Sequence, residues 1–120
     1  MRIAVDLDGV IAQLKAPGQT YAEVIPIPGA VERLKELRAA GHYIIINSAR
    51  NMATCEANLG RVIRNVGKVT LDWLERHGVE YDEIFFGKPN ADVYIDDRAV
   101  RFVEWTLISD DLLQREARAR

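Results

Sequence analysis

The chain begins with MRIAVDLDGV (residues 1–10), in which a short apolar run ends at Asp6 and a second carboxylate follows at Asp8. The unbroken apolar run at 3–5 is typical of a buried parallel strand. Burying a carboxylate costs free energy unless the group is paired or binds a metal. The two acids therefore either close a strand at the surface or form a site, and this stretch alone leaves both readings open.

The composition is that of an ordinary globular protein and argues against several classes of function. Of the 120 residues, 48% are hydrophobic and 28% charged, and the formal net charge is −2. This charge provides no basic surface for nucleic acid, and the longest apolar runs are shorter than a membrane span. The N-terminal acids are incompatible with a signal peptide, and the single cysteine, Cys55, cannot form an internal disulfide. We expect one cytoplasmic domain over residues 1–120.

Two segments have clear helix punctuation. The stretch 28–41 opens with Pro28 and closes with Gly41, and its apolar positions follow helical spacing. A second helix is expected over 66–77, ended by Gly78. Ser109, followed by two acids, is a plausible start for a third.

Strands are expected between these helices, which sets the fold class. The intervening segment 10–27 is expected to form an ordered loop or flap, and 51–64 is ambiguous, with a turn of helix near Gly60. The apolar strand-like stretches lie at 2–6, 42–47, 81–86 and 92–96. This alternation predicts an α/β fold: a Rossmann-like three-layer α/β/α sandwich with a mainly parallel sheet and helices on both faces.

Each expected strand delivers polar side chains to one edge of that sheet. In such sheets the ligand site lies at the carboxyl ends of the strands. Any one of these signals has a structural explanation, such as a helix cap or a solvated charge, but four together are hard to explain as capping. The polar groups in question are Asp6 and Asp8 after the first strand, Asn47, Ser48 and Arg50 after the second, Lys88 after the third, and Asp96 and Asp97 after the fourth.

This set has the parts needed for phosphoryl transfer. Carboxylate oxygens suit Mg²⁺ better than zinc, and no Cys/His cluster with zinc spacing is present. Ser48 and neighbouring backbone N–H groups can hold a phosphate oxygen, and Lys88 can neutralise its charge. A carboxylate can also act as the nucleophile. No G-x-x-x-x-G-K-[ST] sequence is present, so a nucleotide P-loop is not used.

The stretches DLDGV (6–10), NSAR (47–50) and YIDDR (94–98), together with Lys88, resemble the four motifs of the haloacid dehalogenase (HAD) superfamily. They occur in that family's order. The stretch 67–102 further resembles small HAD phosphatases of capsular-polysaccharide biosynthesis. The resemblance implies a Mg²⁺-dependent phosphomonoesterase that hydrolyses a sugar phosphate or related small metabolite through an aspartyl-phosphate, with a role in polysaccharide or nucleotide-sugar biosynthesis.

The resemblance also implies a role for each matching residue. Asp6 is expected to be the nucleophile, Asp8 the general acid/base and Lys88 the stabilising cation. The implied phosphate-binding set is Ser48, Ala49, Lys88, Leu7 and Asp8, and the implied Mg²⁺ ligands are Asp6, Asp8, Asp96 and Asp97. Arg50 and Asn51 are candidates for substrate contact, and Arg50 is alternatively a partner for an acid such as Asp97.

The gaps between the motifs leave no room for a large cap domain. Capless members of the resembled family tend to oligomerise or to act on bulky substrates, so a homo-oligomer, dimer or tetramer, is expected. Three other functions stay open: a phospho-accepting signalling domain, a catalytically inactive HAD-like binding module, and a phosphomutase. The order of the acids disfavours the first, the complete motif set disfavours the second, and the missing cap disfavours the third.

Overall fold

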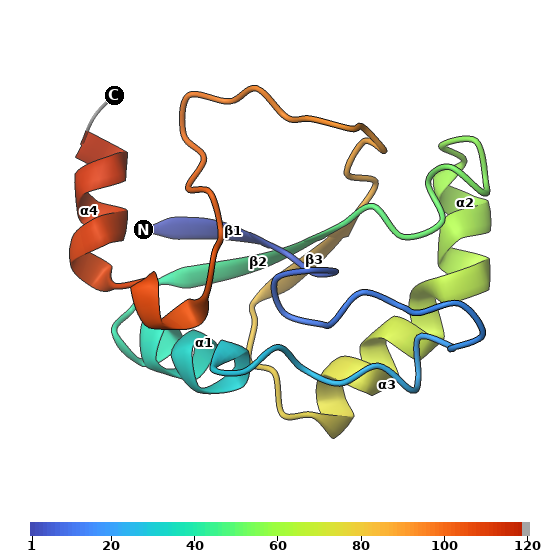
Figure 1. Cartoon of the computed structure of the whole chain (residues 1–120), viewed down its shortest axis with the longest axis horizontal. Helices are drawn as coiled ribbons and strands as arrows, with labels where there is room; N and C mark the ends of the chain where they lie inside the picture. Colours follow the sequence, from blue (N-terminus) through green and yellow to red (C-terminus); the bar gives the residue numbers. More distant parts are fainter. Residues whose placement is uncertain (119–120) are drawn as a thin grey trace.

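The computed structural model describes residues 1–118 and has a three-stranded parallel sheet at its centre (Figure 1). The strands are β1 (Arg2–Asp6), β2 (Tyr43–Ser48) and β3 (Glu83–Phe86), in the order β1-β2-β3. The register pairs Asp6 with Asn47 and Ser48 with Phe86. All three strands therefore end at one edge, where sequence reasoning expected the site.

The helices connect and flank these strands. Helix α1 (Ala30–Ala39) joins β1 to β2, and a longer helical stretch joins β2 to β3. That stretch comprises α2 (Leu59–Val62), a π-helical turn (Ile63–Gly67) and α3 (Lys68–Arg76). A 3₁₀ turn (Trp105–Leu107) precedes α4 (Asp110–Arg118). The predicted helices at 28–41, 66–77 and after Ser109 are confirmed, with ends shifted by a few residues.

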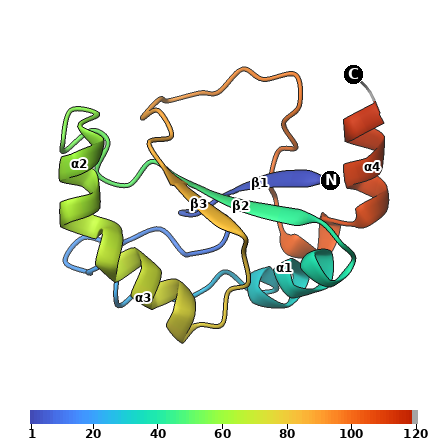
Figure 2. The same cartoon turned by 180° about the vertical axis from the view of Figure 1, so that it is seen from behind.

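Helices α1 and α3 cover the same face of the sheet (Figures 1 and 2). Both crossovers move along the sheet in one direction, and right-handed connections then place their helices on one side. Burial follows this arrangement: Val5 and Ile46 on the covered face are buried, whereas Ala4 and Phe85 on the other face are exposed. The α/β fold with a parallel sheet and no large cap is confirmed, but these two helices do not divide between the faces as expected.

The predicted strand at 92–96 is wrong: this segment has no strand structure, and residues 91–99 are all exposed. Parallel strands need a connection of a dozen or more residues, and only 87–91 separate the end of β3 from this segment. Residues 88–104, here called the strap, instead arch over the sheet without regular secondary structure (Figure 1).

The core lies between the sheet and its helices. Leu7 turns its side chain fully into this core, as expected of a residue between two site acids. Trp73 and Trp105 are both buried, and their indole N–H groups donate to the carbonyls of Val24 and Val10 at 2.8 and 2.7 Å. These bonds hold the two ends of the loop 10–27 against the core, in which Ile11, Ala12 and Val24 are buried. Among residues 1–118, no helix combines the length and apolar character needed to cross a bilayer.

Candidate functional site

Asp6 and Lys88 meet at the carboxyl edge of the sheet. Lys88 Nζ lies 3.2 Å from Asp6 Oδ2, and the other oxygen, Oδ1, accepts a hydrogen bond from the Leu7 backbone N–H at 3.0 Å. The Asp6 side chain is one-third exposed, so a ligand can approach it, while Lys88 is mostly covered. The contact fixes the carboxylate and places a positive charge where a bound anion needs one.

A tight turn after β3 sets the position of Lys88. The backbone N–H groups of Gly87 and Lys88 both donate to the carbonyl oxygen of Ser48, at 3.1 and 3.0 Å. Gly87 has φ of 119°, and a Cβ added there would lie 2.9 Å from Cδ2 of Leu59. The Lys88 ammonium also lies 4.3 Å from the ring centroid of Tyr94 in the strap. The glycine therefore permits the turn that aims Lys88 at Asp6.

We expect Gly87→Ala to displace this turn. A side chain at this φ costs about 1–3 kcal/mol, and the exposed Leu59 side chain would also have to move aside. The expected result is a clear loss of thermal stability and weakened phosphate binding, measured by calorimetry. Gly60→Ala is the matched control because its added Cβ meets no atom closer than 3.5 Å and its φ is ordinary. Equal behaviour of the two variants would contradict this account of Gly87.

Asp8 forms a bidentate ion pair with Arg50. Arg50 Nε donates to Oδ2 of Asp8 and Nη2 donates to Oδ1, both at 2.9 Å. The Arg50 side chain is completely buried, and that of Asp8 is 25% exposed. The two parallel hydrogen bonds hold the Asp8 carboxylate in one orientation.

Two further residues contact the Arg50 guanidinium. Nη1 donates to the Thr70 hydroxyl at 3.1 Å, and the Tyr21 ring centroid lies 4.0 Å from the guanidinium carbon. Burial raises the pKa of Tyr21 above its ordinary value, as does the Asp8 charge, and Arg50 opposes both. Sequence reasoning did not single out Thr70. Its one signal was a hydroxyl on an otherwise apolar helix face.

The loop after β2 carries the other predicted phosphate contacts. Ser48 is buried, and its Oγ accepts a hydrogen bond from the Arg50 backbone N–H at 3.1 Å. Ala49 packs against a second small apolar cluster that includes Cys55. Asn51 has a left-handed φ of 58°, and its Oδ1 accepts from Asn65 at 3.4 Å. The loop is therefore tightly built beside Asp6 and Asp8.

The structure does not bring Asp96 and Asp97 to the first two acids. Both are exposed on the strap; Asp96 Oδ1 accepts the Arg98 backbone N–H at 2.8 Å, and Asp97 lies 3.9 Å from the Arg98 guanidinium. Arg50 contacts Asp8 rather than Asp97, and its buried guanidinium does not reach solvent. Within residues 1–118, no group of three or more His, Cys, Asp or Glu side chains is placed to hold a metal.

A crystal structure of a target protein from Vibrio cholerae matches 98% of this chain and 97% of its own, with 36% identity and a TM-score of 0.86. The chain belongs to the family of this Vibrio protein. No activity is named for that relative. Neither a family model nor a curated protein matches the chain.

A second solved structure supports the fold assignment. The D,D-heptose 1,7-bisphosphate phosphatase from B. bronchiseptica, crystallised with magnesium and phosphate, is 20% identical with a TM-score of 0.50. The match covers 76% of this chain and 51% of the phosphatase. The chain therefore shares its fold with this phosphatase.

In this member of the Vibrio family, the two carboxylates at the strand ends do not by themselves fit Mg²⁺. Oxygen ligands are of the right kind, but Asp6 is paired with Lys88 and Asp8 with Arg50. Mg²⁺ keeps several water ligands and is usually held by one or two carboxylates, so both acids would have to share their oxygens with these cations. Within residues 1–118, no third acidic side chain joins them in a group that could hold a metal.

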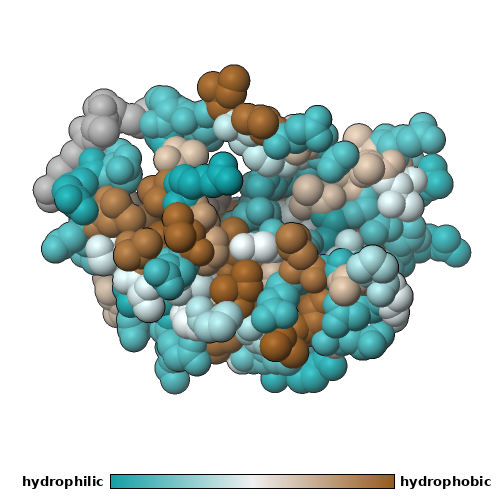
Figure 3. Space-filling view, viewed as in Figure 1, coloured by the Kyte–Doolittle hydropathy of each residue, from teal (hydrophilic) through white to brown (hydrophobic). Residues whose placement is uncertain are grey.

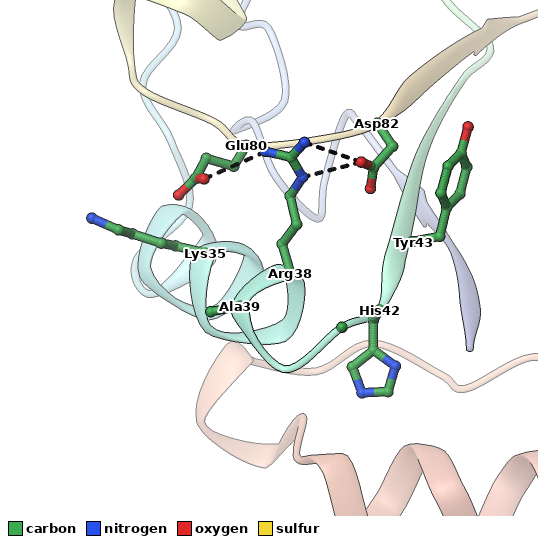
Figure 4. A pocket seen from close by; sticks show the side chains of 8 residues that line it. Lys35, Arg38, Ala39, His42, Tyr43, Glu80 and Asp82 are labelled. Carbon is green, nitrogen blue, oxygen red and sulfur yellow. Dashed lines mark hydrogen bonds and ion pairs between the residues drawn. The ribbon is translucent and has the colours of Figure 1, made fainter.

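Two pockets lie outside the pair of acids. One, of about 460 Å³, borders the turn that carries Lys88 and is lined by Met52, Ala53, Glu56, Ala57, Gly87, Pro89 and Asn90. The other lies near the amino end of β2, where Arg38 contacts Asp82 at 3.1 Å and Glu80 at 3.5 Å (Figure 4). The Ile44 backbone N–H, together with Arg38, lowers the pKa of Asp82. Asp82 and Glu80 thus neutralise the charge of Arg38. The pocket in Figure 4 is therefore a poor binding site for an anion.

Proposed function

We propose that the protein is a phosphomonoesterase that uses Asp6 as its nucleophile. The observation that carries the proposal is the Asp6–Lys88 contact at the carboxyl edge of the sheet, with a partly exposed carboxylate beside a largely covered cation. An Asp6 oxygen attacks phosphorus, the bond from phosphorus to the leaving oxygen breaks, and that oxygen takes up a proton. Water then attacks the aspartyl-phosphate, releasing inorganic phosphate and restoring the carboxylate.

Asp8 is proposed to take the proton from that water. Its two oxygens accept hydrogen bonds from Arg50, which holds the carboxylate in one orientation. Delivery of a proton to the leaving oxygen in the first step is also assigned to Asp8. The Ser48 loop and Lys88 hold the phosphoryl oxygens, with backbone N–H groups near Leu7, Asp8 and Ala49 contributing.

The proposed substrate is a sugar phosphate or similar small metabolite. Two observations support this class: the heptose bisphosphate phosphatase shares the fold, and Gly87 and Pro89, which flank Lys88, line a pocket of about 460 Å³. A role in polysaccharide or nucleotide-sugar biosynthesis, a cytoplasmic location and a homo-oligomeric state are parts of the same proposal. Asn51 remains a proposed substrate contact.

Phosphate release from a panel of esters tests the proposal. We expect purified protein to hydrolyse at least one sugar phosphate with Mg²⁺ present, and we expect EDTA to abolish the reaction and added Mg²⁺ to restore it. The panel includes hexose and heptose phosphates, nucleotides and small phosphate esters. If no ester is hydrolysed with any divalent metal, the protein is better described as a binding module on this fold.

A further inference from the structure

The sheet has an open edge on the side next to the candidate site. Among residues 1–118, β1 is an edge strand that pairs with β2 alone, and an open strand edge is a template for another strand. The segment 92–96 has the composition of a strand but lies exposed in the strap. Val93 is 73% exposed and Ile95 is 100% exposed. Figure 3 shows hydrophobic side chains standing out along the outer edge of the molecule, where the strap runs.

The segment 92–96 cannot lie parallel to β1 of its own chain. Lys88 is held at the carboxyl end of β2 by its bond to Ser48, and the four steps from residue 88 to residue 92 span at most about 14 Å. Reaching the amino end of β1 on its open side requires roughly 16 Å along the strand and 10 Å across two strand spacings, about 19 Å in a straight line. An antiparallel arrangement would carry Asp96 away from Asp6.

We propose that two copies of the chain exchange this segment, so that 92–96 of each copy pairs in parallel with β1 of the other. The evidence for the exchange is the open edge of β1 and the short connection after β3. The role of the exchange in catalysis rests on the proposed function. Asp96 of the partner subunit then lies beside Asp6 and supplies a carboxylate that one chain does not place there.

The side chains agree with this register. Alternate residues of a strand face opposite sides of a sheet. With residue 96 opposite Asp6, the apolar Val93 and Ile95 fall opposite Ile3 and Val5, whose side chains pack into the core on the helix-covered face. The acid falls on the same face as Asp6. Two exposed apolar side chains become buried, and Asp96 of the partner subunit meets Asp6.

Mixing two inactive variants tests the exchange. We expect Asp6→Asn and Asp96→Asn each to lack activity and high-affinity Mn²⁺ binding as separate preparations. Unfolding and refolding them together at equal ratio produces mixed dimers with one intact site, restoring roughly a quarter of the wild-type activity in a random two-fold assembly. Mn²⁺ titration by electron paramagnetic resonance gives a readout independent of turnover and is expected to recover in parallel.

The matched control mixes Asp6→Asn with Lys88→Met. Both residues belong to the same half of the site, so no mixed dimer contains an intact site and no recovery is expected. If wild-type protein is active but the Asp6→Asn and Asp96→Asn mixture shows no recovery, the exchange is overturned and the phosphatase proposal stands. An inactive wild type would overturn the phosphatase proposal. The exchange would then be tested by Mn²⁺ binding and by cross-linking.

Disulfide cross-linking provides the structural test. Ala4→Cys and Tyr94→Cys in one chain would lie opposite each other across the exchanged strands, as would Arg2→Cys and Asp92→Cys. We expect mild oxidation to link two chains covalently for either pair, with little linkage in the single variants; the native Cys55 is buried. A closed disulfide within one chain, or a wild type that is monomeric by light scattering at the concentrations of the activity assay, would overturn the exchange.

Discussion

Asp6→Asn is expected to abolish phosphate release while leaving the fold intact. An amide cannot form the acyl-phosphate, and loss of a catalytic nucleophile typically costs about 10⁵-fold or more in kcat. The expected loss of stability is small, about 1 kcal/mol, because Asp6 is one-third exposed and its one cationic contact is Lys88. Steady-state kinetics and thermal unfolding check the two parts.

Asp72→Asn is the control for this substitution. Asp72 pairs with Lys68 one helical turn away at 2.7 Å, on the surface of α3 and away from the site acids. We expect unchanged kcat and nearly unchanged stability for this variant. An Asp6→Asn protein with kcat near that of the wild type would remove Asp6 from its role as nucleophile and would leave Lys88 without a catalytic partner.

Asp8→Asn is expected to damage both turnover and stability, which separates it from Asp6→Asn. Loss of a general acid/base lowers kcat by about 10²- to 10⁴-fold. The Arg50 guanidinium would keep its charge in a completely buried position without a carboxylate partner. Removing one member of such a pair costs about 3 kcal/mol, the lower end of the usual range, because Asp8 itself is partly exposed.

Denaturant unfolding and pre-steady-state kinetics together check the second prediction. The double variant Asp8→Asn with Arg50→Met is expected to recover part of the lost stability, since the buried charge is gone, but none of the lost activity. Equal stability of Asp8→Asn and wild type would show that Arg50 does not depend on Asp8. Unaltered kinetics would remove Asp8 from proton transfer.

The sequence was sufficient to predict which polar residues lie together where the strands of the sheet end. Asp6, Ser48 and Lys88 each follow a strand, and parallel strands end at one edge; the measured contacts place all three there. The choice of partner for Arg50 was not predictable. Asp8 and Asp97 are both acids at expected strand ends, and chain spacing does not say which one lies across the loop from a given arginine.

The predicted strand at 92–96 was wrong for a different reason. The pattern around it is that of a strand, but a strand also needs a connection long enough to reach its place, and 87–91 are too few. The composition of residues 92–96 predicts an extended backbone. Whether that segment can join the sheet depends on the number of residues that connect it to β3. The covered face of the sheet was similarly decided by the direction of two crossovers, which a list of elements does not contain.

The buried guanidinium of Arg50 has a consequence for motion. It joins the turn after β1 through Asp8, the end of β2 through its own backbone, and α3 through Thr70. If one of these segments separated alone, the Arg50 charge would lose a partner while it is still buried. The three segments are therefore expected to open together. Backbone amides of the Asp8 turn are therefore expected to exchange with deuterium at rates close to those of the central strand. The proposed site is thus expected to lie in a part of the chain that opens only when the whole fold does.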